Sequence, residues 1–314
     1  MGEKFIKMQK RIAIQLFGHL RTYEKLAPYF IENVVKANEK DGYKVDIFIH
    51  TWDELDHNTI TYRNLGSNFM QEKISENEIQ KIYKLYNPKK LLIEKQKDCK
   101  EKTINQKMGT KQSIKGCFNM AHSLYQGSNL RREYAKENNI KYDWVIVTRA
   151  DILFKNPYRI DDFLNIYSLY GFEINKNSLF YSLHQFARGK IKERRFLGAS
   201  DLIYFANEEN VNKATSLCEN FYKNIDFDDF YCMEIWWYDF WCSMGLLPLE
   251  VQYSEEDDFE VVQNEEKLKK FFPMDYKNSK YKKYILKKKI FSVFPYFLVK
   301  EKIEKLNKKL LNCV

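Results

Sequence analysis

"YDWVIVTRADILF", Tyr142 to Phe154, is the stretch that decides the fold, because a buried strand ends in it at a charged pair. The residues from Trp144 to Thr148 are apolar or β-branched, a composition typical of a strand inside a sheet. Arg149 and Asp151 then follow. The pair is either a surface ion pair where the strand leaves the sheet or part of a ligand site, since open α/β sheets bind ligands outside the carboxyl ends of their strands.

Two earlier stretches end in a similar way. "RIAIQLF" at residues 11–17 predicts one strand, and "YKVDIFIH" predicts another at residues 45–49. Gly18 to Thr22 follow the first, and His50 to Asp53 follow the second. Each end alone can be an ordinary turn or the edge of a core. Because parallel strands bring their carboxyl ends to one edge of a sheet, we expect all three ends to lie together, which favours a functional site.

The first half of the chain alternates strand and helix. A helix is expected after the first strand, and "SENEIQKIYKLY" begins another with a capping box formed by Ser75 and Glu78. "PKKLLIEK" predicts a third strand, and a long helix is expected over about residues 111–138. The second half predicts strands in "NSLFYSLHQF" and "SDLIYFAN", and an aromatic helix that ends at Gly245. This order favours an α/β fold with a mostly parallel sheet flanked by helices.

The positive charge is concentrated at the end of the chain. The sequence has a net charge of +9, and residues 277–314 hold twelve lysines and two glutamates, so the preceding body is close to neutral. A nucleic-acid-binding body should carry its basic footprint on the folded domain, so we expect no nucleic-acid partner. The lysines alternate with apolar residues at helical spacing, which predicts a basic amphipathic helical tail able to lie on an anionic membrane surface. The alternative is a solubilising pair of helices packed on the body.

Six scattered cysteines and the absence of signal-peptide features favour a cytoplasmic chain. The cysteines form no C-x-x-C pair or finger spacing, and His57 and His122 have no ligand-like spacing either. The sequence has no run of about 18 apolar residues, so we expect no membrane-spanning helix. We therefore expect a cytoplasmic protein that is peripheral on the inner face of the cytoplasmic membrane.

The three strand ends together carry a family resemblance. "QLFGHLRTYEK", "DIFIHTWDE" and "YDWVIVTRADILF" resemble bacterial glycosyltransferases of the GT-A type, which build surface polysaccharides such as capsule or lipooligosaccharide. The resemblance covers about residues 11–255. It implies a GT-A-like, Rossmann-like sheet, a nucleotide-diphosphate sugar as donor, and a glycan or lipid-linked glycan as acceptor. It also implies a divalent metal, Mn²⁺ or Mg²⁺, held by a short acidic motif after a central strand.

The resemblance assigns roles to individual residues. Asp151 would be the metal ligand, although Arg149 stands where the family motif has its first acid, so that Arg149 could neutralise the diphosphate directly or pair with Asp151. Trp52 would stack on the base. The residues implied to bind the nucleotide sugar are Phe17, Gly18, His19, Arg21, His50, Thr51, Trp52, Arg149 and Asp151.

The resemblance also implies a carboxylate in the second half that takes the proton from the attacking hydroxyl. The aromatic helix "DFYCMEIWWYDFWCSMG" offers Glu234, the preferred base, and Asp239, the second choice. Asp201 of "GASDLIYF" is the third. The same helix can instead be a core helix whose charges point outward.

We predict a GT-A-like domain over residues 1–275, with a nucleotide-sugar half at about 1–155 and an acceptor half at about 156–275, followed by the basic tail at 276–314. The alternative is a non-catalytic nucleotide- or glycan-binding protein with the same fold.

Overall fold

A computed structural model describes residues 9–57, 67–99, 103–105, 111–171, 173–183, 188–191, 194–224 and 233–272. The predicted tail at 276–314 lies outside the described residues. The chain divides into two compact units, residues 1–265 and 266–314, and the sheet with its covering helices belongs to the first. Helix α9 (Glu265–Phe271) begins at the boundary between them.

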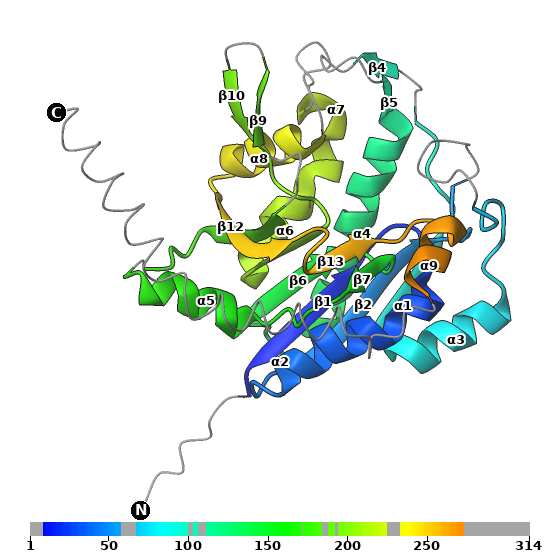
Figure 1. The fold of residues 1–314 in the computed structure, drawn as a ribbon, viewed down its shortest axis with the longest axis horizontal. Helices are drawn as coiled ribbons and strands as arrows, with labels where there is room; N and C mark the ends of the chain where they lie inside the picture. The colour runs from blue at the N-terminus through cyan, green and yellow to red at the C-terminus, as the bar shows by residue number, and fades with distance from the viewer. Residues whose placement is uncertain are drawn as a thin grey trace, which may run out of the picture. The chain divides into compact units, whose positions relative to one another are not determined.

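A seven-stranded sheet forms the centre of the first unit, in the order β12-β8-β11-β6-β1-β2-β3 (Figure 1). All neighbours in it pair in parallel except β11, which is antiparallel to both β6 and β8. The prediction of a mostly parallel sheet is therefore confirmed. The strands are β1 (Arg11–Leu16), β2 (Lys44–Trp52), β3 (Lys90–Glu94), β6 (Trp144–Thr148), β8 (Ser178–Leu183), β11 (Ile203–Ala206) and β12 (Leu247–Ser254).

Helices cover both faces of this sheet and bury two separate apolar cores (Figure 1). On one face lie α1 (Tyr23–Phe30), the π-helical turn η1 (Ile31–Lys36), α2 (Ala37–Glu39), α3 (Glu76–Tyr86) and α5 (Ile160–Leu169). On the other lie α4 (Ile114–Glu137), α6 (Glu208–Thr215), the 3₁₀ helix η2 (Ser216–Asn220), α7 (Phe221–Asn224) and α8 (Met233–Ser243).

Three short pairs of antiparallel strands complete the fold. They are β7 (Ile152–Phe154) with β13 (Phe259–Val261), β9 (Arg188–Ile191) with β10 (Arg194–Leu197), and β4 (Thr103–Asn105) with β5 (Lys111–Ser113).

The alternation of side chains along β1 serves both cores at once. Ile12, Ile14 and Leu16 pack into the core beneath α1, whereas Ala13 packs into the core beneath α4. This is the period-2 pattern expected of a strand buried on both faces. Helix α4 lies next to β1 at Gly127, where an added Cβ would be in van der Waals contact with the side chain of Gln15 at 3.6 Å.

Two predicted boundaries differ from the structure. Strand β2 continues through Trp52 instead of ending at residue 49, because His50 and its neighbours pair with β3 and are buried. The long helix begins at Ile114, since residues 111–113 form β5. The predicted cap is confirmed for Ser75, whose Oγ accepts a hydrogen bond from the backbone N–H of Glu78 at 3.3 Å. The carboxylate of Glu78 instead accepts hydrogen bonds from Tyr23 and Lys81.

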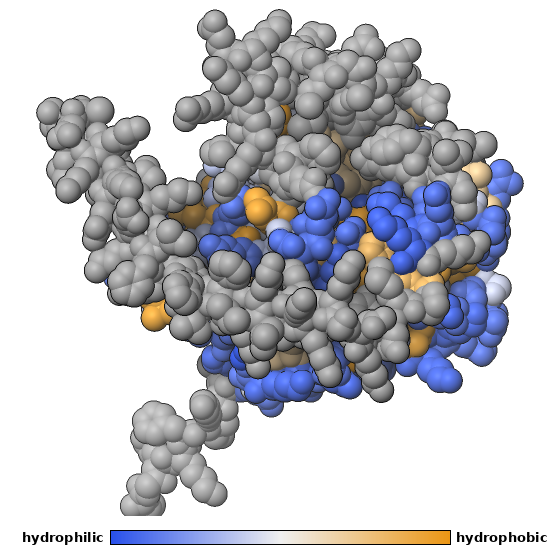
Figure 2. All heavy atoms as spheres, in the orientation of Figure 1, coloured by the Kyte–Doolittle hydropathy of each residue, from blue (hydrophilic) through white to orange (hydrophobic). Residues whose placement is uncertain are grey.

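Within the described ranges, no helix has both the length and the apolar character needed to cross a membrane. Figure 2 shows hydrophilic residues over much of the described surface on the viewed face, with hydrophobic residues in smaller groups between them.

Candidate functional site

The order of the strands places the topological switch point of the sheet between β1 and β6. Strands β2 and β3 follow β1 on one side, and β6 lies on its other side, so the chain reverses its direction of progress across the sheet between β1 and β6 (Figure 1). In open α/β sheets, ligands bind outside the carboxyl ends of the strands at such a switch point. The loop from Phe17 to Thr22 follows β1, and Arg149 to Asp151 follow β6, so both segments lie at this switch point.

The loop after β1 is anchored by its first residues. Phe17 is buried and its N–H donates to Thr148 O at 3.1 Å, while the N–H of Gly18 donates to Ser123 Oγ at 2.8 Å. Gly18 has φ +83°, a left-handed conformation that glycine adopts without a steric cost. Among the described residues, no acceptor engages the N–H groups of His19 or Leu20. The loop therefore offers two backbone donors next to the start of α1.

Arg21 connects this loop to β6. Its Nε donates to Asp56 Oδ1 at 2.8 Å, and its Nη1 donates to Asp151 Oδ2 at 2.6 Å. Its backbone lies at φ +47°, an unusual conformation for a non-glycine residue, and its N–H donates to Leu55 O at 2.9 Å. The side chain is only 10% exposed, so its two carboxylate partners fix its position.

Arg149 binds the same aspartate from the other side. Its Nε donates to Asp151 Oδ1 at 2.8 Å and its Nη2 donates to Asp151 Oδ2 at 2.6 Å. Burial favours the protonated acid, but the charges of Arg149 and Arg21 and their hydrogen bonds outweigh it and lower the pKa of Asp151. Within the part of the chain that the structure describes, Nη1 of Arg149 and Nη2 of Arg21 have no acceptor. The carboxylate of Asp151 thus binds two guanidinium groups, and each of them has N–H donors without an acceptor among the described residues.

The surroundings of Asp151 do not fit the divalent metal that the resemblance implies. Mg²⁺ and Mn²⁺ require open oxygen ligands. Both oxygens of Asp151 accept hydrogen bonds from guanidinium groups, and the side chain is fully buried. A cation there would have to displace an arginine.

The predicted residues after the second strand form a buried aromatic cluster. His50 and Thr51 are fully buried and Trp52 is 2% exposed. The rings of His50 and Trp52 meet edge to face with centroids 4.9 Å apart, and Trp52 stacks on His122 at 5.9 Å. Little of the Trp52 ring is therefore open to a nucleotide base, so its predicted stacking role would require this cluster to open.

Next to this cluster lies Glu94, which was not among the predicted site residues. Glu94, at the end of β3, has its Oε2 at 3.1 Å from His50 Nε2 and at 2.9 Å from His122 Nε2. Burial opposes ionisation of Glu94, but hydrogen bonds from His122, Lys97 and His50 outweigh it and lower the pKa of Glu94 to about 2. Burial lowers the pKa of His50 to about 4. The one sequence signal was position, since Glu94 ends a third strand at the same edge.

His19 lies between the two groups. Its Nδ1 is 3.1 Å from Glu54 O, and its Nε2 is 2.9 Å from Gln96 Nε2. Burial and the charge of Arg21 hold the pKa of His19 well below its usual range, so this predicted ligand-binding residue is a neutral imidazole at pH 7.

The three candidate bases occupy different positions. Asp201 precedes β11, whose first residue Ile203 pairs with Thr148, so Asp201 lies at the carboxyl end of β6. Glu234 is partly buried at the start of α8, and its carbonyl accepts from the N–H of Ala199 at 2.9 Å, near that same edge. Asp239 is exposed, farther along α8.

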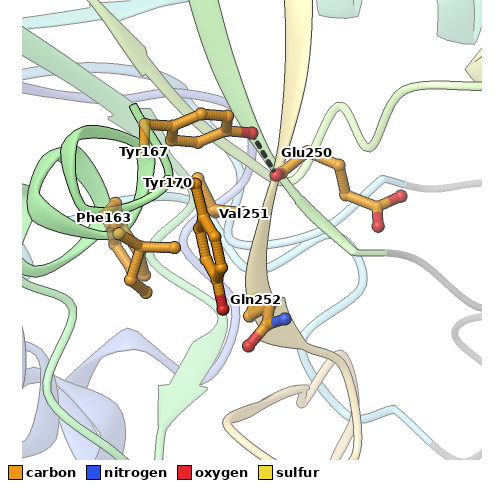
Figure 3. Close-up of a pocket in the computed structure, with 7 residues that line it drawn as sticks. Phe163, Tyr167, Tyr170, Glu250, Val251 and Gln252 are labelled. Carbon is orange, nitrogen blue, oxygen red and sulfur yellow. Dashed lines mark hydrogen bonds between the residues drawn. The ribbon is translucent and has the colours of Figure 1, made fainter. Parts of the chain in front are cut away.

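A pocket of about 170 Å³ lies between α5 and β12 (Figure 3). Phe163, Tyr167 and Tyr170 line it from the helix, and Tyr167 Oη donates to Glu250 O at 2.7 Å. None of its lining residues belongs to the ends of β1 or β6, so the pocket is separate from the switch point.

Comparison with known proteins adds a family and a distant structural likeness. A family model described as "Domain of unknown function (DUF7796)" matches residues 7–186. No curated protein matches the sequence. The structure is similar to the crystal structure of a "putative nucleotide-diphospho-sugar transferase" from Desulfovibrio desulfuricans G20, with 9% identity and a TM-score of 0.39, over 87% of this chain and 93% of that one. At this TM-score and identity, the likeness supports no conclusion about activity.

The buried position of Asp151 predicts a large effect on stability. Asp151→Asn keeps the shape but leaves Arg21 and Arg149 without their shared carboxylate, so the free energy of unfolding should fall by about 3–5 kcal/mol. Urea unfolding measures it. The matched control is Asp53→Asn, because Asp53 pairs with Lys73 through a partly exposed contact of 3.1 Å. That variant should lose about 1 kcal/mol or less, and an equally small loss for Asp151→Asn would contradict its supporting role.

Proposed function

Since the chain belongs to the DUF7796 family, whose description states no function, we propose a function from its own site: a glycosyltransferase that moves a sugar from a nucleotide-diphosphate sugar to a surface-glycan acceptor. One observation carries the proposal. Arg21 and Arg149 share Asp151 at the switch point of the sheet, and each retains N–H donors that have no acceptor among the described residues.

A diphosphate is the ligand that best matches these donors. Guanidinium groups bind phosphate oxygens through paired, charge-assisted hydrogen bonds, and an arginine held in place loses little further entropy on binding. The N–H groups of His19 and Leu20 lie in the same loop, just before α1, where backbone donors and the helix dipole favour anions. The loop after β1 and the end of β6 would thus contact the two phosphates from adjacent strands.

The same arrangement suits the chemistry of glycosyl transfer. The acceptor oxygen forms a bond to the anomeric carbon while the bond from that carbon to the phosphate oxygen breaks. The departing nucleoside diphosphate carries away the electron pair and gains negative charge. Arg149 and Arg21 would stabilise that charge as it develops, from fixed positions, which is the most effective form of electrostatic catalysis. This role needs no metal at Asp151.

A carboxylate from the second half would take the proton of the acceptor hydroxyl. We assign this role to Glu234, because it is partly buried in the aromatic helix α8 and its backbone contacts the segment that leads into β11. Aromatic faces suit the C–H surfaces of sugars. Asp201 is the next candidate, since the register of β11 brings it to the same edge.

The acceptor and the membrane belong to the proposal as well. Residues 277–314 carry twelve lysines and two glutamates, and each lysine near an anionic leaflet contributes about 1 kcal/mol of attraction. A chain held at the inner face of the cytoplasmic membrane would meet lipid-linked acceptors of capsule or lipooligosaccharide there.

Arg149→Gln tests the donor site. Loss of one fixed donor to the leaving group should reduce turnover about 10²-fold. The measurement is the nucleoside diphosphate released from a panel of nucleotide sugars, with and without a lipid extract as acceptor. Arg159→Gln is the matched control, because Arg159 also pairs with an aspartate, Asp41, before the opposite end of β2. Its turnover should be unchanged.

The outcome also separates the two functional classes. A second outcome is that nucleoside diphosphates bind the parent chain and bind the Arg149→Gln variant more weakly, while no nucleotide sugar releases its diphosphate. That outcome would indicate a non-catalytic nucleotide-binding protein. No binding of any nucleotide diphosphate would reject the proposed donor site.

Glu234→Gln tests the base. Turnover should fall by about 10²-fold or more while donor affinity stays nearly the same, because the base acts on the acceptor proton. Asp239→Asn is the control on the same helix and should retain activity, since Asp239 is exposed. A full effect in Asp201→Asn, with little in Glu234→Gln, would transfer the role to Asp201.

The membrane proposal predicts that the full-length chain co-sediments with anionic lipid vesicles at low salt and is released as salt screens the charge. A chain truncated after residue 275 should stay in the supernatant. Sedimentation of the truncated chain at an equal level would show that the tail is not the membrane-binding element.

A further inference from the structure

We infer that His50, Glu94 and His122 form a binding site for Zn²⁺, separate from the arginine pair and independent of the proposed glycosyl transfer. The three side chains come from β2, β3 and α4 and meet at the carboxyl edge of the sheet. Their ligand atoms all lie within 4.8 Å of one another. In the part of the chain that the structure describes, this is the one such group of three.

The distances match a metal centre. Around a tetrahedral Zn²⁺ with bonds of 2.0–2.1 Å, neighbouring ligand atoms lie about 3.3 Å apart. Glu94 Oε2 lies 3.1 Å from His50 Nε2 and 2.9 Å from His122 Nε2. Small shifts would thus place all three around one ion. Two imidazoles and one carboxylate are a ligand set that favours zinc and related transition ions over Mg²⁺ or Ca²⁺.

Each histidine has a second partner that holds its ring in place. His50 Nδ1 lies 2.7 Å from Ser123 Oγ, and His122 Nδ1 lies 3.7 Å from Cys218 Sγ. With Nε2 on a metal, each Nδ1–H would donate to these groups, and such an outer contact fixes the tautomer and the orientation of a metal-binding histidine. Ser123 Oγ also accepts from the N–H of Gly18, so the site would be connected to the loop after β1.

The site is accessible to an ion. His50 is fully buried, but the side chains of His122 and Glu94 are 12% and 20% exposed. Lys97 Nζ contacts Glu94 Oε1 at 3.0 Å, which leaves Oε2 to face the histidines, and the partly exposed side chain of Lys97 can turn to solvent. Gln126 approaches His122 Nε2 at 3.4 Å, so its amide or a water molecule could provide the fourth ligand.

The full-length chain, stripped with a chelator, tests the site directly with Co²⁺ as a probe. We expect one equivalent of Co²⁺ to give visible d–d absorption, without the thiolate-to-cobalt band that cysteine ligation would add, and Zn²⁺ to displace it. Glu94→Gln and His122→Gln should each weaken binding at least about 100-fold, and Ser123→Ala about 10-fold or more. His57→Gln is the matched control, because His57 lies near His19 but outside the site.

The Lys97→Gln variant distinguishes a local effect at the metal site from misfolding. It removes a positive charge beside Glu94 and no ligand, so metal affinity should increase. A chain that binds no Co²⁺ or Zn²⁺ at one equivalent would overturn the inference. Equal affinity for the metal in Glu94→Gln, His122→Gln and the parent chain would also overturn the inference, because the ion would then lie elsewhere. A strong thiolate-to-cobalt band would do the same, since it would show cysteine ligation.

Discussion

The carboxylate of Asp151, buried between two guanidinium groups, is the interaction on which the site depends. An ionised group without water is stable only when its partners replace the lost hydration, and here Arg149 from the same strand end and Arg21 from the loop after β1 do so. The contact therefore joins two loops separated by 130 positions in the sequence. It also explains how Arg21 is kept in a backbone conformation that few residues other than glycine adopt.

The architecture around this contact directs polar groups to one edge of the sheet. Strands β1, β2, β3 and β6 run in the same direction, so their carboxyl ends coincide. Apolar residues fill most of both faces of these strands, and most of the charged side chains lie toward the strand ends. Two neighbouring clusters result: the arginine pair around Asp151 beside β6, and the histidine–glutamate group beside β2 and β3. The Ser123 hydroxyl, which contacts both His50 and Gly18, connects the second cluster to the loop of the first.

Much of this fold follows from local sequence patterns, whereas the partners within the site do not. Apolar, β-branched runs such as Trp144 to Thr148 identify the strands, and the alternation of strand and helix identifies the parallel sheet, because both patterns reflect short-range chemistry. The pairing of Arg21 with Asp56 and Asp151, and of Glu94 with His50 and His122, depends on which strands become neighbours. No spacing in the sequence encodes that. For the same reason, the sequence predicted that Trp52 stacks on a base, whereas the packing of β2 against β3 and α4 buries its ring.

The reversed direction of β11 has a consequence for how such a chain can diversify. Because β11 runs against its neighbours, its first residue and not its last lies at the ligand edge, opposite Thr148. The segment that enters β11 can therefore change in length and composition at that edge while the pairing of β1 with β6 stays intact. One connecting segment can thus vary among related chains while the ion pairs of Arg21 and Arg149 with Asp151, and the sheet beneath them, stay undisturbed.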